Sequence, residues 1–182
     1  MLELSLHILD IVENSTRAGA KRVYIDIIED RKRDLLSLEI RDNGSGMSED
    51  VLKKAMDPFF TTKTVRNVGL GLPMLAQAAE RTGGRLIVES KGEEGTRVVA
   101  EFNLSHIDRQ PLGNMASTLV TLVAGNTDVD FIYRHRHNDR EYILDTRAIK
   151  KEMGDVPINH VKVLTFTRNN VLEGLGKIKT EA

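Results

Sequence analysis

The chain has 182 residues, enough for one large or two small domains, and its 40% hydrophobic content can supply a core. A formal net charge of −1 offers no basic field, so we expect neither nucleic acid nor a membrane as a partner. The absence of cysteine excludes disulfides and thiolate metal sites. With no apolar run of membrane length and no signal-peptide pattern, a cytoplasmic protein is expected.

The first predicted element is an amphipathic helix over about residues 4–18, whose apolar positions recur three or four residues apart. A polar stripe with the same spacing projects along another side of this helix. Its members are His7, Asp10, Asn14 and Arg17. We interpret His7 as a packing or solvated residue, which is the commoner role of a histidine on a helix.

Two alternating segments follow and predict a hairpin, with strands at about residues 23–28 and 36–41 and a turn over residues 30–34. Because side chains alternate across a strand, Asp42 falls on the same face as Leu38 and Ile40. Its carboxylate should therefore point toward the apolar side of the sheet. A buried carboxylate needs a hydrogen-bonding partner.

The next elements are a helix over about residues 48–56 and an aperiodic segment over residues 57–68, which we interpret as a mobile loop. Gly69 and Gly71 open a third helix, which ends at residues 83–84. Strands are predicted near residues 85–90 and 96–104. Thr96 shares the apolar face of the last strand, so its hydroxyl should point inward.

Four short motifs occur along these elements, and each is weak when taken alone. An Asp-Asn-Gly sequence is usually a turn, and a Gly-x-Gly before a helix is usually a cap or hinge. Together they supply a metal-binding amide, a buried carboxylate, a basic lid and a glycine-opened helix, which are the parts of an ATP site. The motifs are Glu13-Asn14-Ser15, Asp42-Asn43-Gly44-Ser45-Gly46-Met47, Pro58-Phe59-Phe60-Thr61-Thr62-Lys63 and Gly69-Leu70-Gly71-Leu72-Pro73.

With these motifs in this order, residues 1–105 resemble the GHKL ATPases, which include sensor histidine kinases, gyrase, Hsp90 and the mismatch-repair protein MutL. The resemblance implies an α/β fold, specifically an α+β two-layer sandwich of the Bergerat type with a mixed sheet backed by helices. Residues 13–20 look most like MutL. The Phe-Phe-Thr-Thr-Lys lid and the Gly-Leu-Gly-Leu motif look like histidine kinases.

This resemblance implies that ATP and Mg²⁺ are the cofactors. Asn14 would ligate Mg²⁺ through its side-chain oxygen, the kind of ligand that this ion prefers. Asp42 would accept a hydrogen bond from the exocyclic amine of adenine. Gly44 and Gly46 would let the backbone pass close to the purine. Thr96 matches the Gly-Thr pair on the strand beside adenine.

The resemblance also implies residues that bind the phosphates. Gly69 and Gly71, with Leu72 in the same motif, open a helix whose free amides and dipole favour anions. Lys63 on the lid could supply a compensating positive charge. Arg17 lies where histidine kinases often carry a basic residue that reaches the phosphates.

Asp10 is the candidate catalytic residue, and it leaves the activity open. In ATP-hydrolysing members of the family, a glutamate one turn before the asparagine polarises the attacking water, and Asp10 is one methylene shorter. A displacement of about 1 Å can cost roughly a hundredfold in rate. Either hydrolysis is slow, or Asp10 reaches the metal shell through a water and does no base chemistry.

Residues 106–182 match no motif, and we expect a small C-terminal α/β extension that packs on the first domain and offers a partner surface. Its pattern predicts a helix ending at residues 125–126, a hairpin over residues 131–144 and a helix over about residues 146–153. The last segment fits a strand or a helix capped by Asn159, and we favour the helix. His135 and His137 share a strand face and could bind a metal, although the sequence places no third ligand.

Two functional hypotheses follow. The chain begins almost at the first motif and leaves no room for a hairpin with a phosphoacceptor histidine, so we do not expect a self-contained sensor kinase. It could act in trans on an unidentified protein partner, as a freestanding kinase like the anti-sigma-factor kinases or as a regulatory ATPase. Alternatively, it is a nucleotide-gated interaction module with little or no catalysis. A homodimer is a further option that the sequence leaves open.

Overall fold

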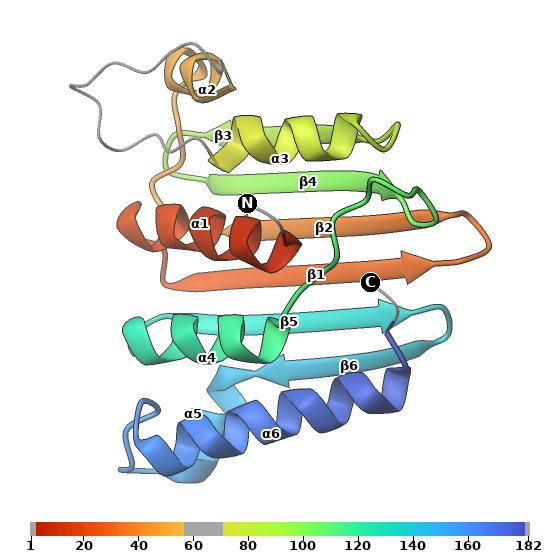
Figure 1. Ribbon diagram of the computed structural model, residues 1–182. Coiled ribbons are helices and arrows are strands. Elements are labelled where there is room, and N and C mark those ends of the chain that lie inside the picture. The colour runs from red at the N-terminus through yellow and green to blue at the C-terminus, as the bar shows by residue number, and fades with distance from the viewer. Residues whose placement is uncertain (1–2, 57–70, 181–182) are drawn as a thin grey trace.

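The computed structural model describes residues 3–56 and 71–180 (Figure 1). Within these ranges the helices are α1 (Leu4–Arg17), α2 (Glu49–Met56), α3 (Gly71–Glu80), α4 (Met115–Gly125), α5 (Thr146–Met153) and α6 (Val161–Ile178). The strands are β1 (Arg22–Asp30), β2 (Leu35–Asp42), β3 (Arg85–Lys91), β4 (Gly95–Asn103), β5 (Asp130–His137) and β6 (Arg140–Asp145). The predicted elements of the described residues are confirmed, and the last segment is the helix.

All six strands belong to one sheet, in the order β3-β4-β2-β1-β5-β6. Neighbouring strands are antiparallel except for β1 and β5, which run parallel. The sheet is therefore mixed, as expected for the two-layer sandwich. Residues 106–180 contribute β5 and β6, which continue the sheet directly beside β1. Figure 1 shows α1, α3, α4 and α6 lying over one face of this sheet.

The core fills the space between this helix layer and the sheet. It combines side chains from both parts of the chain, such as Ile8 on α1, Ile25 on β1 and Leu119 on α4, all fully buried. The other face of the sheet carries charged side chains that pair across strands. Arg97 bonds Glu39 at 2.9 Å, for example. Because the apolar side chains point toward the helices, a ligand cavity in this fold belongs on the helix side.

The start of α1 is held by the segment that links β4 to α4. Its first amide groups have no side-chain cap; instead the Leu4 and Ser5 N–H groups donate to the carbonyl oxygens of Pro111 and Leu112, at 3.0 and 2.8 Å. Gly19, with φ of +78°, ends the helix in a conformation that favours glycine. Both ends of the helix that carries Asp10 and Asn14 are thus fixed.

The start of α6 differs from the expected cap. The helix begins at Val161, so the capping position is His160, whose Nδ1 accepts the Lys162 N–H at 3.3 Å. The prediction of Asn159 was wrong by one residue, because helical periodicity does not locate the first turn to a single position. No described helix combines the length and apolar content that spanning a membrane requires.

Candidate nucleotide-binding site

A cavity of about 530 Å³ lies among α1, the end of β2, the start of β4 and the helices α2 and α3. Several predicted site residues from different motifs line it: Asn14, Arg17, Asp42, Gly46, Leu72 and Thr96. Lys63 and Gly69, with the rest of the Phe-Phe-Thr-Thr-Lys motif, lie outside the described residues. The fold therefore brings the first, second and fourth motifs to one cavity.

Asp42 is fixed by hydrogen bonds to both carboxylate oxygens. Its Oδ2 accepts from the Ser15 hydroxyl at 2.6 Å, and its Oδ1 accepts from the Gly44 N–H at 2.8 Å. A carboxylate has about four lone-pair positions, so about two remain for a ligand. Ser15 was not predicted as a site residue because it falls in the apolar stripe of its helix. Its place in that stripe, which faces the end of β2, could have indicated that its hydroxyl points toward Asp42.

Thr96 lies beside Asp42, since the two residues are register partners in β4 and β2. Its Oγ1 is 2.9 Å from the Ser90 hydroxyl oxygen, which also accepts the Met47 N–H at 2.8 Å. Ser90 was not predicted either. It alternates with Leu86 and Val88 on β3, so strand parity would have placed its hydroxyl on the inner face.

The remaining wall of the cavity is mostly apolar. The side chains that form it are Ile11, Ile40, Met47, Val51, Ala55, Leu72 and Val98. Apolar walls with a few fixed polar groups are typical of small-molecule sites. A flat heterocycle could lie between such walls while its polar edge meets Asp42 and Thr96.

Asn14 and Arg17 lie one turn apart on α1 and bond each other. The Arg17 Nη1 donates to Asn14 Oδ1 at 3.1 Å, and Nη2 pairs with Glu13 at 3.1 Å. An amide oxygen beside a guanidinium suits a phosphate group and its cation, because the oxygen can ligate Mg²⁺ and the guanidinium can bond phosphate. The described residues hold no cluster of three or more His, Cys, Asp or Glu side chains suited to a metal. A magnesium ion here would take its other ligands from phosphates and water.

Asp10 lies against Gly71, the first residue of α3. A Cβ atom on Gly71 would overlap the Asp10 carboxylate, so the glycine allows the two helices to approach. Asp10 is not among the residues that line the cavity. It occupies the junction between α1 and the start of α3.

The glycines of the second motif lie close to the protein's own backbone. Gly46 has φ of +64°, and a Cβ atom there would overlap the carbonyl oxygen of Lys91. A Cβ on Gly44 would lie 3.0 Å from the carbonyl oxygen of Ala18. The structure thus gives Gly46 a reason of its own, and the close approach of a purine to both glycines stays a prediction.

The two histidines of β5 do not form a metal site in the part of the chain that the structure describes. His135 uses both ring nitrogens, Nε2 with Glu29 at 2.6 Å and Nδ1 with the Tyr133 hydroxyl at 2.8 Å. The His137 Nδ1–H donates to the Ile178 carbonyl at 2.9 Å. These histidines hold β1, β5 and the end of α6 together.

His7 is a packing residue, as expected. It is 1% exposed, and its Nε2 lies 3.1 Å from the Gln110 side-chain oxygen. That oxygen only accepts, so Nε2 carries the proton. Burial lowers the pKa of His7 below its ordinary value.

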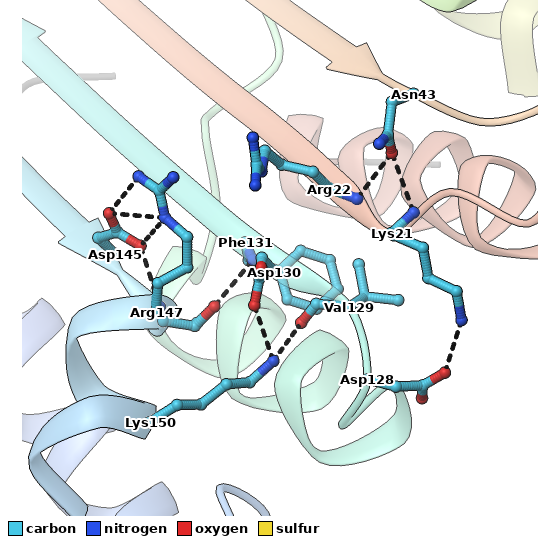
Figure 2. Close-up of polar contacts among 11 residues, drawn as sticks. Lys21, Arg22, Asn43, Asp128, Val129, Asp130, Phe131, Asp145, Arg147 and Lys150 are labelled. Carbon is cyan, nitrogen blue, oxygen red and sulfur yellow. Dashed lines mark hydrogen bonds and ion pairs between the residues drawn. The ribbon is translucent and has the colours of Figure 1, made fainter.

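Polar contacts join the cavity end of β2 to the C-terminal extension (Figure 2). Asn43, directly after Asp42, accepts the N–H groups of Lys21 and Arg22 at 2.9 and 2.8 Å. The Lys21 ammonium in turn lies 3.0 Å from Asp128, before β5. The loop that follows Asp42 is thus tied to the starts of β1 and β5.

Comparison with known proteins identifies relatives of the first 106 residues. Residues 2–106 match the family described as Histidine kinase-, DNA gyrase B-, and HSP90-like ATPase. The sensor kinase CckA of Brucella abortus is 41% identical over 79 residues, and the C4-dicarboxylate transport sensor protein DctB of Pseudomonas aeruginosa is 39% identical over 83 residues. These alignments cover 43% and 45% of this chain, but only 8% and 13% of those relatives.

Two solved structures share the fold over most of the chain. The N-terminal domain of a DNA repair protein gives a TM-score of 0.55 over 80% of this chain and 53% of its own, at 15% identity. The Aquifex aeolicus MutL ATPase domain, solved with ADP, gives 0.51 over 84% and 69%, also at 15% identity. With the family match spanning more than half of its residues, the chain belongs to the histidine kinase-, DNA gyrase B- and HSP90-like ATPases and carries their ATP-binding domain.

Proposed function

We propose that the protein binds Mg-ATP in this cavity and acts in trans on a protein partner, as a freestanding kinase of the histidine-kinase type or as a regulatory ATPase. The observation that carries the proposal is the composition of one cavity: a fixed carboxylate, apolar walls, and an amide oxygen beside a guanidinium. The sensor-kinase relatives support the kinase reading. A protein partner, a homodimer and a cytoplasmic location stay predictions.

The adenine end is the best supported part of the proposed site. The lone pairs that Asp42 does not use for Ser15 and Gly44 would accept the exocyclic amine of adenine. Ile40 and Val98, which are register partners and line the cavity, would contact the base from the side of the sheet. A MutL ATPase domain of similar fold was solved with ADP, which agrees with a nucleotide in this fold.

For the phosphate end we propose Asn14, Arg17 and the start of α3 at Gly71. Asn14 would hold Mg²⁺, and the Arg17 guanidinium would bond phosphate oxygens in place of Asn14. Magnesium, when bound, supplies positive charge to the phosphates. The helix start offers amide groups that favour anions.

Asp10 is our candidate for a catalytic carboxylate, because it stands one turn before Asn14 on the helix that borders the cavity. Its contact with Gly71 also favours the second function, the nucleotide-gated interaction module. A phosphate that binds at the start of α3 would press on this contact and shift α3 relative to α1. Such a shift would alter the helix-side surface without turnover.

Labelled ATP separates the kinase from the regulatory ATPase. The purified protein would be incubated with γ-labelled ATP and cell extract, with Asn14→Ala as the test variant and Glu39→Gln, on the other sheet face, as its control. Label on one extract protein that disappears only with Asn14→Ala supports the kinase. Phosphate release by the protein alone, lost in Asp10→Ala, supports the regulatory ATPase.

The interaction module predicts a different set of results. Calorimetric binding of Mg-ATP without label transfer or phosphate release would support the interaction module. Light scattering with and without Mg-ATP tests the homodimer. A protein that binds no adenine nucleotide with or without Mg²⁺ would contradict both functions.

A further inference from the structure

Ser90, near the end of β3, makes hydrogen bonds to three groups around the adenine end of the cavity. Its Oγ accepts the Met47 N–H at 2.8 Å, donates to the Gly95 carbonyl at 3.1 Å, and lies 2.9 Å from Thr96 Oγ1. Met47 and Thr96 both line the cavity, whereas Ser90 does not. Ser90 therefore acts on the site through its neighbours.

The number of protons that these groups carry decides which hydroxyl donates in the hydrogen bond between Ser90 and Thr96. A serine hydroxyl has one proton and accepts at two lone pairs. The Met47 amide can only donate and the Gly95 carbonyl can only accept, so the Ser90 proton goes to Gly95. All three bonds are made together only when Thr96 donates its own proton to Ser90.

With its proton turned to Ser90, Thr96 presents only lone pairs to the cavity. Asp42, its register partner on β2, is a carboxylate and also only accepts. We propose that Ser90 is a positioning residue that orients the Thr96 hydroxyl, so that this end of the cavity offers acceptors alone and selects a 6-aminopurine over a 6-oxopurine. The inference rests on the proposed nucleotide site and adds a determinant of base specificity to it.

The chemistry of the two bases explains the selection. A 6-amino group carries two protons and suits two neighbouring acceptors. A 6-oxopurine offers one donor, its N1–H, in place of the two amino protons, and its 6-oxo oxygen would face Asp42 and Thr96 without a donor, which is costly. If Ser90 is removed, the Thr96 hydroxyl is free to rotate and donate to the 6-oxo oxygen.

The test is calorimetric binding of ADP and inosine diphosphate to the full chain, as wild type, Ser90→Ala and Ser90→Thr. We expect wild type to prefer ADP, and Ser90→Ala to reduce the ratio of the two dissociation constants about three- to tenfold, the value of one hydrogen bond. Ser90→Thr, which keeps a hydroxyl, should restore the ratio. Ser90→Cys, whose thiol bonds weakly, should give an intermediate ratio and serves if the alanine variant does not fold.

Losing the Met47 bond would weaken both nucleotides by the same factor, so a purely structural role leaves the ratio unchanged. The same substitution in a Thr96→Val background should not change the ratio, because the hydroxyl that Ser90 orients is gone. An unchanged ratio in Ser90→Ala, or an equal change in the Thr96→Val background, would overturn the inference while ADP still binds. Wild-type protein that binds neither nucleotide would instead overturn the proposed function.

Discussion

Two acidic side chains on the inner face of the sheet, Asp42 on β2 and Glu29 on β1, have opposite surroundings. Asp42 borders the cavity and is bonded by Ser15 and Gly44, with lone pairs left for a ligand. Glu29 is completely buried; His135 bonds it at 2.6 Å, and the Thr180 hydroxyl bonds the same oxygen. The Asp42 carboxylate is available to bind a ligand, whereas the Glu29 carboxylate is enclosed by protein side chains.

The difference shows that an inward-facing polar residue indicates a site only where its neighbours leave a cavity beside it. Around Glu29, Tyr133 and His135 complete a buried chain of hydrogen bonds between β1, β5 and the end of α6. Burial raises the pKa of Tyr133 well above its ordinary value, so its hydroxyl stays protonated and can donate. We expect this cluster to contribute to stability and the Asp42 cluster to ligand binding.

The largest expected effect is on the Glu29 side of this comparison. Glu29→Ala removes the acceptor of a fully buried histidine and leaves a cavity, and it should reduce the free energy of unfolding by about 3 kcal/mol. Urea unfolding measures it. Glu29→Gln keeps an acceptor of the same shape and should cost less. A loss below about 1 kcal/mol in the alanine variant would show that the cluster is not structural.

On the Asp42 side, the expected effect is on affinity. Asp42→Asn should weaken ADP binding about ten- to a hundredfold, because a hydrogen bond to a charged group is worth about 1.5–3 kcal/mol. Calorimetry gives the dissociation constants, and urea unfolding should show a smaller change than for Glu29→Ala. Unchanged affinity would remove Asp42 from the adenine site.

We expect His7 to make the free energy of unfolding depend on pH, independently of Asp42 and Glu29. Its pKa is lowered in the folded protein, so the unfolded chain binds a proton near pH 6.5 that the folded protein resists. Its contribution is fully present above about pH 6.5 and is lost as the pH falls, with a slope of at most about 1.4 kcal/mol per pH unit.

Unfolding free energies measured from pH 7.5 to pH 5 test this dependence. His7→Leu fills a similar volume and should flatten the curve by the share that belongs to His7. Identical slopes in both proteins would assign the pH dependence to other groups.

The smallest effect is expected on the opposite face of the sheet. Glu39 bonds Arg97 and Arg41 at 2.9 Å on that face. These pairs are half-buried and Glu39→Gln keeps an acceptor, so this variant should change the free energy of unfolding by about 1 kcal/mol and leave ADP affinity unchanged. A loss of affinity in this variant would mean that the two faces are coupled.

Local patterns predicted much of the site because its residues belong to regular elements. Helical spacing placed Asp10, Asn14 and Arg17 on one side of α1, and strand parity pointed Asp42 and Thr96 inward. Both inferences need only the repeat of one element. The supporting residues Ser15 and Ser90 were missed, because a serine in an apolar stripe carries no sign of its partner until two elements meet.

By itself, the sequence determined the elements and the family, since periodicity and short motifs are local. Only the tertiary structure decided that β5 pairs with β1 to extend one sheet and that Gly46 is required by the Lys91 carbonyl. It also decided that Glu29 is closed off by His135 while Asp42 opens on a cavity. Such outcomes depend on which residues, distant in sequence, fill the space beside a polar group, and no local pattern records that.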